Sequence, residues 1–189
     1  VNAEIADEIG VGTIKDNETT PIVSIGTEMS SIIEGSNAQF IIKIDTPADE
    51  DITVTFTIGG DVDSLDYTEP TTYTVVIPAG ETEVPLNITT LVDNVYEGSE
   101  DLKIDLVGTS GSNSIINPLE DNAKVEVLDS KDAPKVSIVT DQSKIPEGTT
   151  AEFVIKIDTP ADEDITVTFT IDGDVNSSDY TAPVVFTVV

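Results

Sequence analysis

The chain repeats itself along its length. Residues 42–58 read IKIDTPADEDITVTFTI, and residues 155–171 read the same letters, which sets an offset of 113 positions. The same offset relates further pairs of residues: Pro21 and Pro134, Glu34 and Glu147, Asp66 and Asp179, and Asp16 and Asp129. A fixed period of this length indicates tandem domains, so the fold is predicted for one repeat at a time. Near-identical domains in series are typical of proteins in which repeats set length and stiffness.

The period divides the chain into three parts. Residues 1–20 correspond to 114–133 and are expected to be the final strand and exit of a preceding repeat. Residues 21–133 form one complete repeat, and residues 134–189 correspond to the first half of the next, with four strands expected. Either this half repeat is a fragment, which we favour, or another molecule completes it. The short linker Ser130–Pro134 contains a proline, which is expected to limit the swing between domains.

Alternating apolar and polar residues predict the fold class. From Ile52 to Ile58, apolar residues alternate with threonines, as in a strand with one buried face and one solvated face. In the complete repeat, this pattern predicts strands at roughly 22–26, 37–45, 51–58, 71–77, 82–91, 100–107 and 123–129. Pro85 lacks a backbone donor, which places its strand at an edge or a bulge. Because no segment has a helical period, we predict all-β, tandem immunoglobulin-like antiparallel β-sandwiches.

Composition excludes several classes of function. Asp and Glu number 37 against 8 lysines, so the net charge is -29, which repels nucleic acid and anionic membranes. The charge also repels itself unless a cation neutralises it, although acidity could alternatively serve solubility alone. The chain has no Cys and no His, and it has no apolar run long enough to span a membrane. Without these residues no catalytic triad can form, so we expect no enzyme, although a carboxylate-pair glycosidase stays formally open.

Acidic residues recur in the predicted loops. Glu34 follows the first strand, Asp66 precedes the fourth, the segment 93–100 lies between the fifth and sixth, and Asp129 with Asp132 follows the seventh. In a Greek-key sandwich these loops lie largely at one end, so their carboxylates are expected to converge. The turn 48–51 is expected at the opposite end, exposed to solvent. Converging carboxylates need a cation, and flexible oxygen ligands suit Ca²⁺ better than Mg²⁺. The alternative is that acidic loops merely decorate an acidic protein.

The motifs in this order resemble the Calx-beta domain, a family named for sodium–calcium exchangers and also found in long bacterial surface proteins. They are Glu-Gly, Asp-Tyr-Thr, Ile-Pro-Ala-Gly-Glu-Thr, Asp-Asn-Val-Tyr-Glu-Gly-Ser-Glu-Asp and a final strand that ends in Asp. The resemblance implies a sandwich with calcium at one tip. The implied ligands are Glu34, Asp66, Asp93, Glu97, Glu100, Asp129 and Asp132, with Glu147, Asp179 and Asp16 as their counterparts in the neighbouring repeats. Exchanger domains tend to have a run of aspartates at the exit, where this chain has Asp129-Ser130-Lys131-Asp132, and Asn94 stands where a carboxylate is frequent, which implies fewer ions or weaker binding.

The sequence supports two functions. The first is a calcium-binding extender module of a repetitive, adhesin-like cell-surface protein, in which Ca²⁺ at the junctions between repeats makes the array rigid. Its expected partners are neighbouring repeats and other copies of itself, and its expected location is extracellular or on the cell surface. The alternative is a regulatory Ca²⁺-sensor domain pair of an exchanger-type protein. A sensor predicts tighter binding and a defined partner domain.

Overall fold

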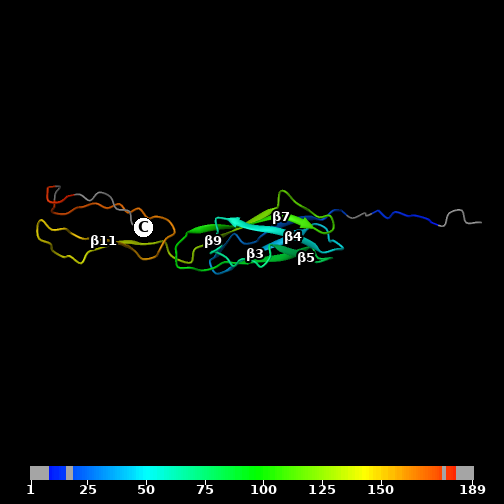
Figure 1. Ribbon diagram of the computed structural model, residues 1–189, viewed down its shortest axis with the longest axis horizontal. Helices are drawn as coiled ribbons and strands as arrows, with labels where there is room; N and C mark the ends of the chain where they lie inside the picture. Colours follow the sequence, from blue (N-terminus) through cyan, green and yellow to red (C-terminus); the bar gives the residue numbers. More distant parts are fainter. Residues whose placement is uncertain (1–8, 16–18, 176–177, 182–189) are drawn as a thin grey trace, which may run out of the picture.

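The complete repeat folds into two sheets that pack face to face (Figure 1). The structure is a computed structural model that describes residues 9–15, 19–175 and 178–181. The first sheet contains, in order, β6 (Glu83–Thr89), β3 (Asn37–Ile44), β1 (Ile22–Gly26) and β8 (Ile115–Ile116). The second contains, in order, β2 (Ser31–Ile33), β9 (Asn122–Leu128), β7 (Ser99–Ser110), β4 (Ile52–Gly60) and β5 (Thr74–Ile77).

Neighbouring strands pair antiparallel except in two cases. Both cases involve β1 and β2, which together form the divided first strand of the fold. β1 pairs with β8 in parallel in one sheet, and β2 pairs with β9 in parallel in the other. The chain therefore changes sheets between β1 and β2, while β3–β6 and β4–β7–β9 supply the antiparallel ladders. Two sheets joined in this way form an immunoglobulin-like sandwich, which confirms the predicted fold class.

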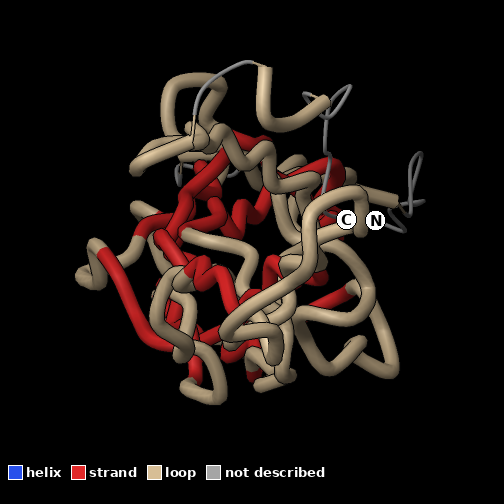
Figure 2. The backbone as a smooth tube through the Cα atoms, turned by 90° about the vertical axis from the view of Figure 1, so that its left-hand side faces the viewer, coloured by secondary structure: helices blue, strands red, loops and turns tan. Residues whose placement is uncertain are grey.

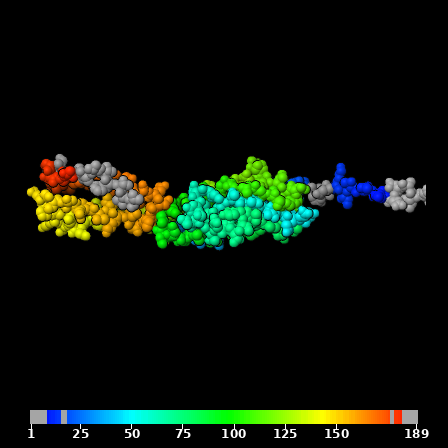
Figure 3. All heavy atoms as spheres, in the orientation of Figure 1, coloured from blue at the N-terminus to red at the C-terminus, as the bar shows by residue number. Residues whose placement is uncertain are grey.

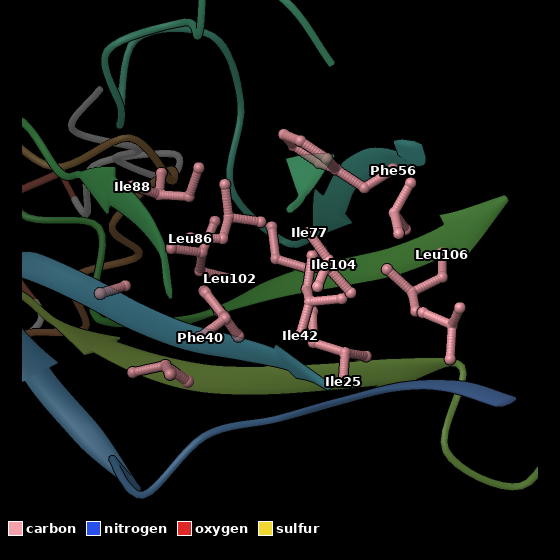
Figure 4. Packing of buried hydrophobic residues seen from close by; sticks show 14 of the residues in the cluster. Ile25, Phe40, Ile42, Phe56, Ile77, Leu86, Ile88, Leu102, Ile104 and Leu106 are labelled. Atoms are coloured by element: carbon pink, nitrogen blue, oxygen red, sulfur yellow. The ribbon is translucent and has the colours of Figure 1, made fainter. Parts of the chain in front are cut away.

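The core lies between the two sheets and follows the period-two pattern. Phe40 and Ile42 on β3 point toward Leu102 and Ile104 on β7 (Figure 4), and all four side chains are fully buried. Burying a large apolar side chain stabilises a fold by about 1.5–3 kcal/mol. The intervening residues face solvent, where Lys103 forms an ion pair at 2.7 Å with a neighbouring aspartate. One apolar face per sheet therefore provides the core.

The seven predicted strands are all present, with boundaries that move by a few residues. Two short strands, β2 and β8, were not predicted, since three and two residues are too few to show a period. β6, which contains Pro85, is an edge strand of its sheet, as predicted from the missing donor. The described part of residues 1–20 contains no strand.

The second repeat begins in the same way as the first. β10 (Val136–Val139) and β11 (Val154–Ile157) pair antiparallel and correspond to β1 and β3. The predicted third strand is wrong, because the described residues 164–171 form no strand. In the first repeat its counterpart, β4, pairs with β7. Phe169 is accordingly 37% exposed, whereas the equivalent Phe56 is 1% exposed. The predicted fourth strand falls on residues outside the described ranges.

The two repeats lie end to end. The second repeat abuts one tip of the sandwich, and the described N-terminal segment leaves from the opposite tip (Figures 1 and 3). Seen along the long axis, the described chain consists of strands and loops without a helix (Figure 2). Accordingly, no helix that is long and apolar enough to span a membrane occurs among the described residues.

Candidate metal centre at the junction of the repeats

Acidic side chains from four connections meet at the tip that faces the second repeat. β4 and β6 both end at this tip, so the β4–β5 loop (61–73) and the β6–β7 loop (90–98) begin there. The turn after β2 and the exit of β9 reach the same tip, because β2 and β9 run in parallel. The topology of the sandwich thus brings together segments that are up to about 100 residues apart.

The carboxylates form two overlapping groups of three. Oxygen atoms of Glu34, Asp93 and Glu97 lie within 4.8 Å of one another, and so do oxygen atoms of Asp66, Glu97 and Glu100. Glu97 belongs to both groups. We call these five residues the tip cluster. Separations of this size leave room for a cation between the oxygens, since Ca²⁺–oxygen distances are about 2.3–2.6 Å.

Buried neighbours hold Asp66 in place. Tyr67 is 9% exposed and packs in the core, and its backbone forms an isolated antiparallel β-bridge with that of Thr90. The backbone carbonyl of Asp66 accepts a hydrogen bond from the amide of Leu91 at 2.7 Å, and its carboxylate accepts one from the amide of Asp63. The tyrosine of the Asp-Tyr motif is therefore an anchor, and the aspartate projects from it toward the tip.

Glycine lets the turn of Glu34 approach the β6–β7 loop. Gly35 has φ of 77°, a conformation that L side chains rarely adopt, and a Cβ there would lie 2.6 Å from Cγ2 of Val92. The carboxylate of Glu34 accepts a hydrogen bond from the amide of Ser130 at 3.2 Å, which joins this turn to the exit of β9. In the Glu-Gly pair, the glutamate thus supplies a carboxylate of the kind that can bind a cation, and the glycine supplies the backbone conformation that positions it.

Asp129 organises the β6–β7 loop. One oxygen accepts hydrogen bonds from the amides of Glu97 at 2.6 Å and Gly98 at 3.3 Å, and the other accepts one from the amide of Lys131 at 2.5 Å. A carboxylate that accepts backbone amides fixes the loop, as an anion does at a helix N-terminus. Asp129 therefore positions Glu97 in the tip cluster.

The negative charges of the tip cluster are not balanced by lysine. Burial, followed by the charges of Asp66 and Asp93, raises the pKa of Glu97 from 4.5 to about 7. Burial, followed by the charges of Asp66 and Glu97, raises the pKa of Glu100 to about 7, and burial also raises the pKa of Asp66. All ion pairs in the described part of the chain lie elsewhere. Such a group is under electrostatic strain that a cation would relieve.

The following repeat contributes to the electrostatics of the tip. The amide of Tyr96 donates to the carbonyl of Pro160 at 2.8 Å, and the amide of Asp162 donates to the carbonyl of Tyr96 at 3.4 Å. The charge of Asp162 adds to the causes that raise the pKa values of Glu97 and Glu100. Sequence reasoning missed Asp162, because its copy in the first repeat lies at the far end of the sandwich. The sequence signal that could have revealed Asp162 was the head-to-tail order of the tandem domains.

The structure brings together most of the acidic residues that the sequence singled out. Glu34, Asp66, Asp93, Glu97 and Glu100 form the tip cluster, and Asp129 lies directly beside it. Asp132 lies apart and is exposed, with Lys135 at 3.7 Å. Glu147 and Asp179 are exposed in the second repeat, where the described residues contain no group of three. Asp16 lies outside the described residues.

The chemistry of the donors fits one class of metal ion. All five side chains offer carboxylate oxygens, and the chain has neither imidazole nor thiolate to offer. Hard oxygen donors suit Ca²⁺, Mg²⁺ or Mn²⁺, whereas zinc and copper sites use nitrogen and sulfur. The tip cluster could therefore hold a hard divalent cation.

Comparison with solved structures relates the fold to Calx domains. The crystal structure of CBD12 from CALX1.2 matches with a TM-score of 0.50 and 16% identity, over 68% of this chain and 53% of that one. The apo-form Calx CBD1 domain matches with a TM-score of 0.48 and 16% identity, over 60% of this chain and 100% of that one. The calcium binding domain CBD12 of CALX1.1 matches with a TM-score of 0.46 and 19% identity, over 56% of this chain and 44% of that one.

At such identities the likeness concerns the fold alone, which agrees with the sandwich described above. No family model and no curated protein matches the chain.

Proposed function

We propose that this chain is a calcium-binding structural module, one part of a tandem array in which Ca²⁺ at the tip of each repeat makes the junction to the next repeat rigid. The observation that carries the proposal is the pair of carboxylate groups that share Glu97 and lack a lysine counter-ion. The Calx-beta resemblance of the same loops implies the same ion.

Glu97 is central to the proposed site. It contributes an oxygen to both groups, so each group would hold an ion and Glu97 would be a ligand in both. Glu34 and Asp93 would complete one site, and Asp66 and Glu100 the other. Ca²⁺ takes six to eight oxygens, so backbone carbonyls and water would supply the remaining ligands.

The position of the tip cluster supports the extender role. The cluster faces the second repeat, whose backbone contacts Tyr96 beside Glu97. Neutralising the cluster would remove the repulsion between Asp162 and the two glutamates with raised pKa values, Glu97 and Glu100. It would thereby favour the docked junction. The array is proposed to lie outside the cell or on its surface, where millimolar calcium is available to weak sites.

Calcium titration of the chelator-treated chain tests the proposal. We expect about two ions for the complete repeat, with dissociation constants near 10⁻⁴–10⁻³ M, as in extracellular modules. Glu97→Gln should weaken calcium binding to both groups, because both groups lose a carboxylate ligand. Glu126→Gln is the matched control, since Glu126 is exposed on β9 outside the cluster. Equal effects of the two substitutions would contradict the proposed site.

The same titration separates the extender from the alternative function. A regulatory sensor of an exchanger-type protein requires micromolar or tighter binding. A dissociation constant in that range would favour the sensor and would overturn the extender role, while leaving the calcium site itself in place.

A further inference from the structure

The chain enters and leaves the complete repeat at opposite tips. β1 begins next to the described N-terminal segment at one tip, and β9 ends beside the tip cluster at the other (Figure 1). Tension on the two ends of the repeat therefore acts along the strands and not across them. The strands that carry the two ends, β1 with β2 and β9, receive this tension first.

The direction of tension decides how the hydrogen bonds of a strand pair are stretched. The hydrogen bonds of a sheet lie across its strands. A pull along a strand therefore stretches all the bonds of its pairing at once, whereas a pull across the strand breaks them one after another. Tension from tip to tip loads β1 in the first way, because β1 lies along the sandwich and pairs with both β3 and β8.

The pairing of β2 with β9 opposes the two chain ends directly. β2 continues from the N-terminal end, β9 leads to the C-terminal end, and the two strands run in parallel. Tension pulls β2 toward one tip and β9 toward the other, so the two strands must slide past each other before the sandwich opens. An antiparallel pair in this place would have both chain ends at one tip and would open bond by bond.

Further hydrogen bonds extend this pairing beyond both strands. The amide of Glu126 donates to the carbonyl of Ser30 at 3.1 Å, before β2 begins. The amide of Glu34 donates to the carbonyl of Leu128 at 3.0 Å, after β2 ends. The carboxylate of Glu34 also accepts the amide of Ser130 at 3.2 Å, beyond the end of β9. All these bonds would be stretched together by tension from tip to tip.

We propose that the β2–β9 pair is a mechanical clamp, which makes the repeat resist unfolding when the chain is pulled by its two ends. This function goes beyond calcium binding and does not require it, because it rests on backbone hydrogen bonds within the complete repeat. Failure of the calcium titration would therefore leave the clamp in place, and failure of the clamp would leave the calcium site in place. A clamp of this kind raises the barrier to forced unfolding, which governs an unfolding rate.

Single-molecule force spectroscopy of the full chain in two pulling directions tests the proposal, since engineered cysteines serve as handles and no native cysteine interferes. One variant carries Thr20→Cys with Ala133→Cys, which applies the force from tip to tip. The other carries Thr20→Cys with Ser110→Cys. β7 ends at the tip where β1 begins, so this second pair applies the force across the strands. All three positions are exposed, and both variants are pulled in EDTA at the same loading rate.

We expect the pull from tip to tip to require a several-fold higher unfolding force than the pull across the strands. Both pulls unfold the same repeat, so a difference in force reports the direction in which the bonds are stretched and not the free energy of unfolding. Unfolding of the repeat is recognised by a gain in length of about 3.3–3.6 Å for each residue between the handles. Equal forces in the two directions would overturn the proposal.

A matched pair of substitutions tests β2 itself. The bonds at Ser30 and Glu34 show that every second residue of β2 faces β9. The amide of Ile32 therefore faces β9, and the amide of Ile33 faces outward, because β2 is an edge strand. Ile32→Pro removes a donor from the clamp, whereas Ile33→Pro removes only an outward donor.

Each proline variant is pulled in both directions, and the ratio of the two forces is compared with that of the unsubstituted β2. We expect Ile32→Pro to lower the ratio toward one and Ile33→Pro to leave it unchanged. The ratio is the informative quantity, because a general loss of stability lowers both forces. An unchanged ratio in Ile32→Pro, or an equal fall in both variants, would overturn the proposal.

Discussion

Replacing Glu100 by glutamine is expected to change the stability of the repeat with opposite signs in the absence and presence of calcium. Glu100 lies at the start of β7, partly buried beside Asp66 and Glu97, and its pKa is raised from 4.5 to about 7. Each pKa unit corresponds to about 1.4 kcal/mol, so full shelter would disfavour the ionised form by about 3 kcal/mol. Partial exposure screens the interaction and reduces the expected penalty to about 1 kcal/mol.

The sign of the pH dependence follows from proton binding. Below pH 4.5, Glu100 is protonated in both the folded and the unfolded chain, so its ionisation does not affect the free energy of unfolding. Between about pH 4.5 and 7 the folded state retains the proton that the unfolded state has released, so stability falls as pH rises. Above pH 7 the full penalty is present. Glu97, with the same direction of shift, adds to the effect.

Urea unfolding in EDTA at pH 5 and pH 8 measures these changes. At pH 8, Glu100→Gln should be more stable than the unsubstituted chain by about 1 kcal/mol, and at pH 5 the difference should nearly vanish. At a calcium concentration well above the dissociation constants of both proteins the order should reverse. Losing a ligand that costs tenfold in affinity removes about 1.4 kcal/mol of the stabilisation by calcium.

Two results would refute this reasoning. If Glu100→Gln destabilised the EDTA form at pH 8, the carboxylate would be making a favourable interaction that the structure does not contain. If calcium stabilised the variant and the unsubstituted chain equally, Glu100 would not be a ligand. The matched control is Glu126→Gln on the exposed face of β9, which should change neither value by more than a few tenths of a kcal/mol.

The other predictions concern the loops and the junction. Asp129→Ala removes the acceptor of three backbone amides and should lower the free energy of unfolding in urea by about 1–3 kcal/mol. It should also weaken calcium binding in titration. Unchanged stability and unchanged calcium binding would contradict the positioning role of Asp129. Gly35→Ala should destabilise the repeat more than Gly80→Ala, because both have positive φ but only the first meets a side chain within 4 Å; equal losses would mean that the close approach is unimportant. Asp162→Pro should broaden the distance distribution between spin labels on the two repeats, while Asp49→Pro in the identical turn should not; equal widths would exclude docking through Tyr96.

The sandwich was predictable because its strands are long and one-sided. Phe40, Ile42, Leu102 and Ile104 alternate with polar residues, and the structure buries all four between the sheets. Pro85, which lacks a backbone donor, predicted an edge or a bulge, and its strand β6 lies at an edge. The short strands β2 and β8 were missed because two or three residues carry no period, and their pairing depends on the tertiary fold.

The second repeat shows where a repeated sequence does not guarantee a repeated structure. Phe153 is 61% exposed although the equivalent Phe40 is fully buried, because strand formation there depends on an opposing sheet. The tip cluster could be anticipated from loop order. The role of Asp129 as an acceptor of backbone amides and the approach of Asp162 could not, since both depend on how loops and neighbouring repeats meet in space.

Thermal unfolding in EDTA, in millimolar Ca²⁺ and in millimolar Mg²⁺ is the most direct test of the proposed calcium site. Millimolar calcium is about ten times a dissociation constant of about 10⁻⁴ M, and a ligand that binds only the folded state at that ratio stabilises it by about 1.4 kcal/mol. For a domain of this size, we expect calcium to raise Tm by about 5 °C or more and magnesium to raise it much less. Equal shifts with both ions, or no shift, would contradict the account and leave the acidic tip as a solvated surface.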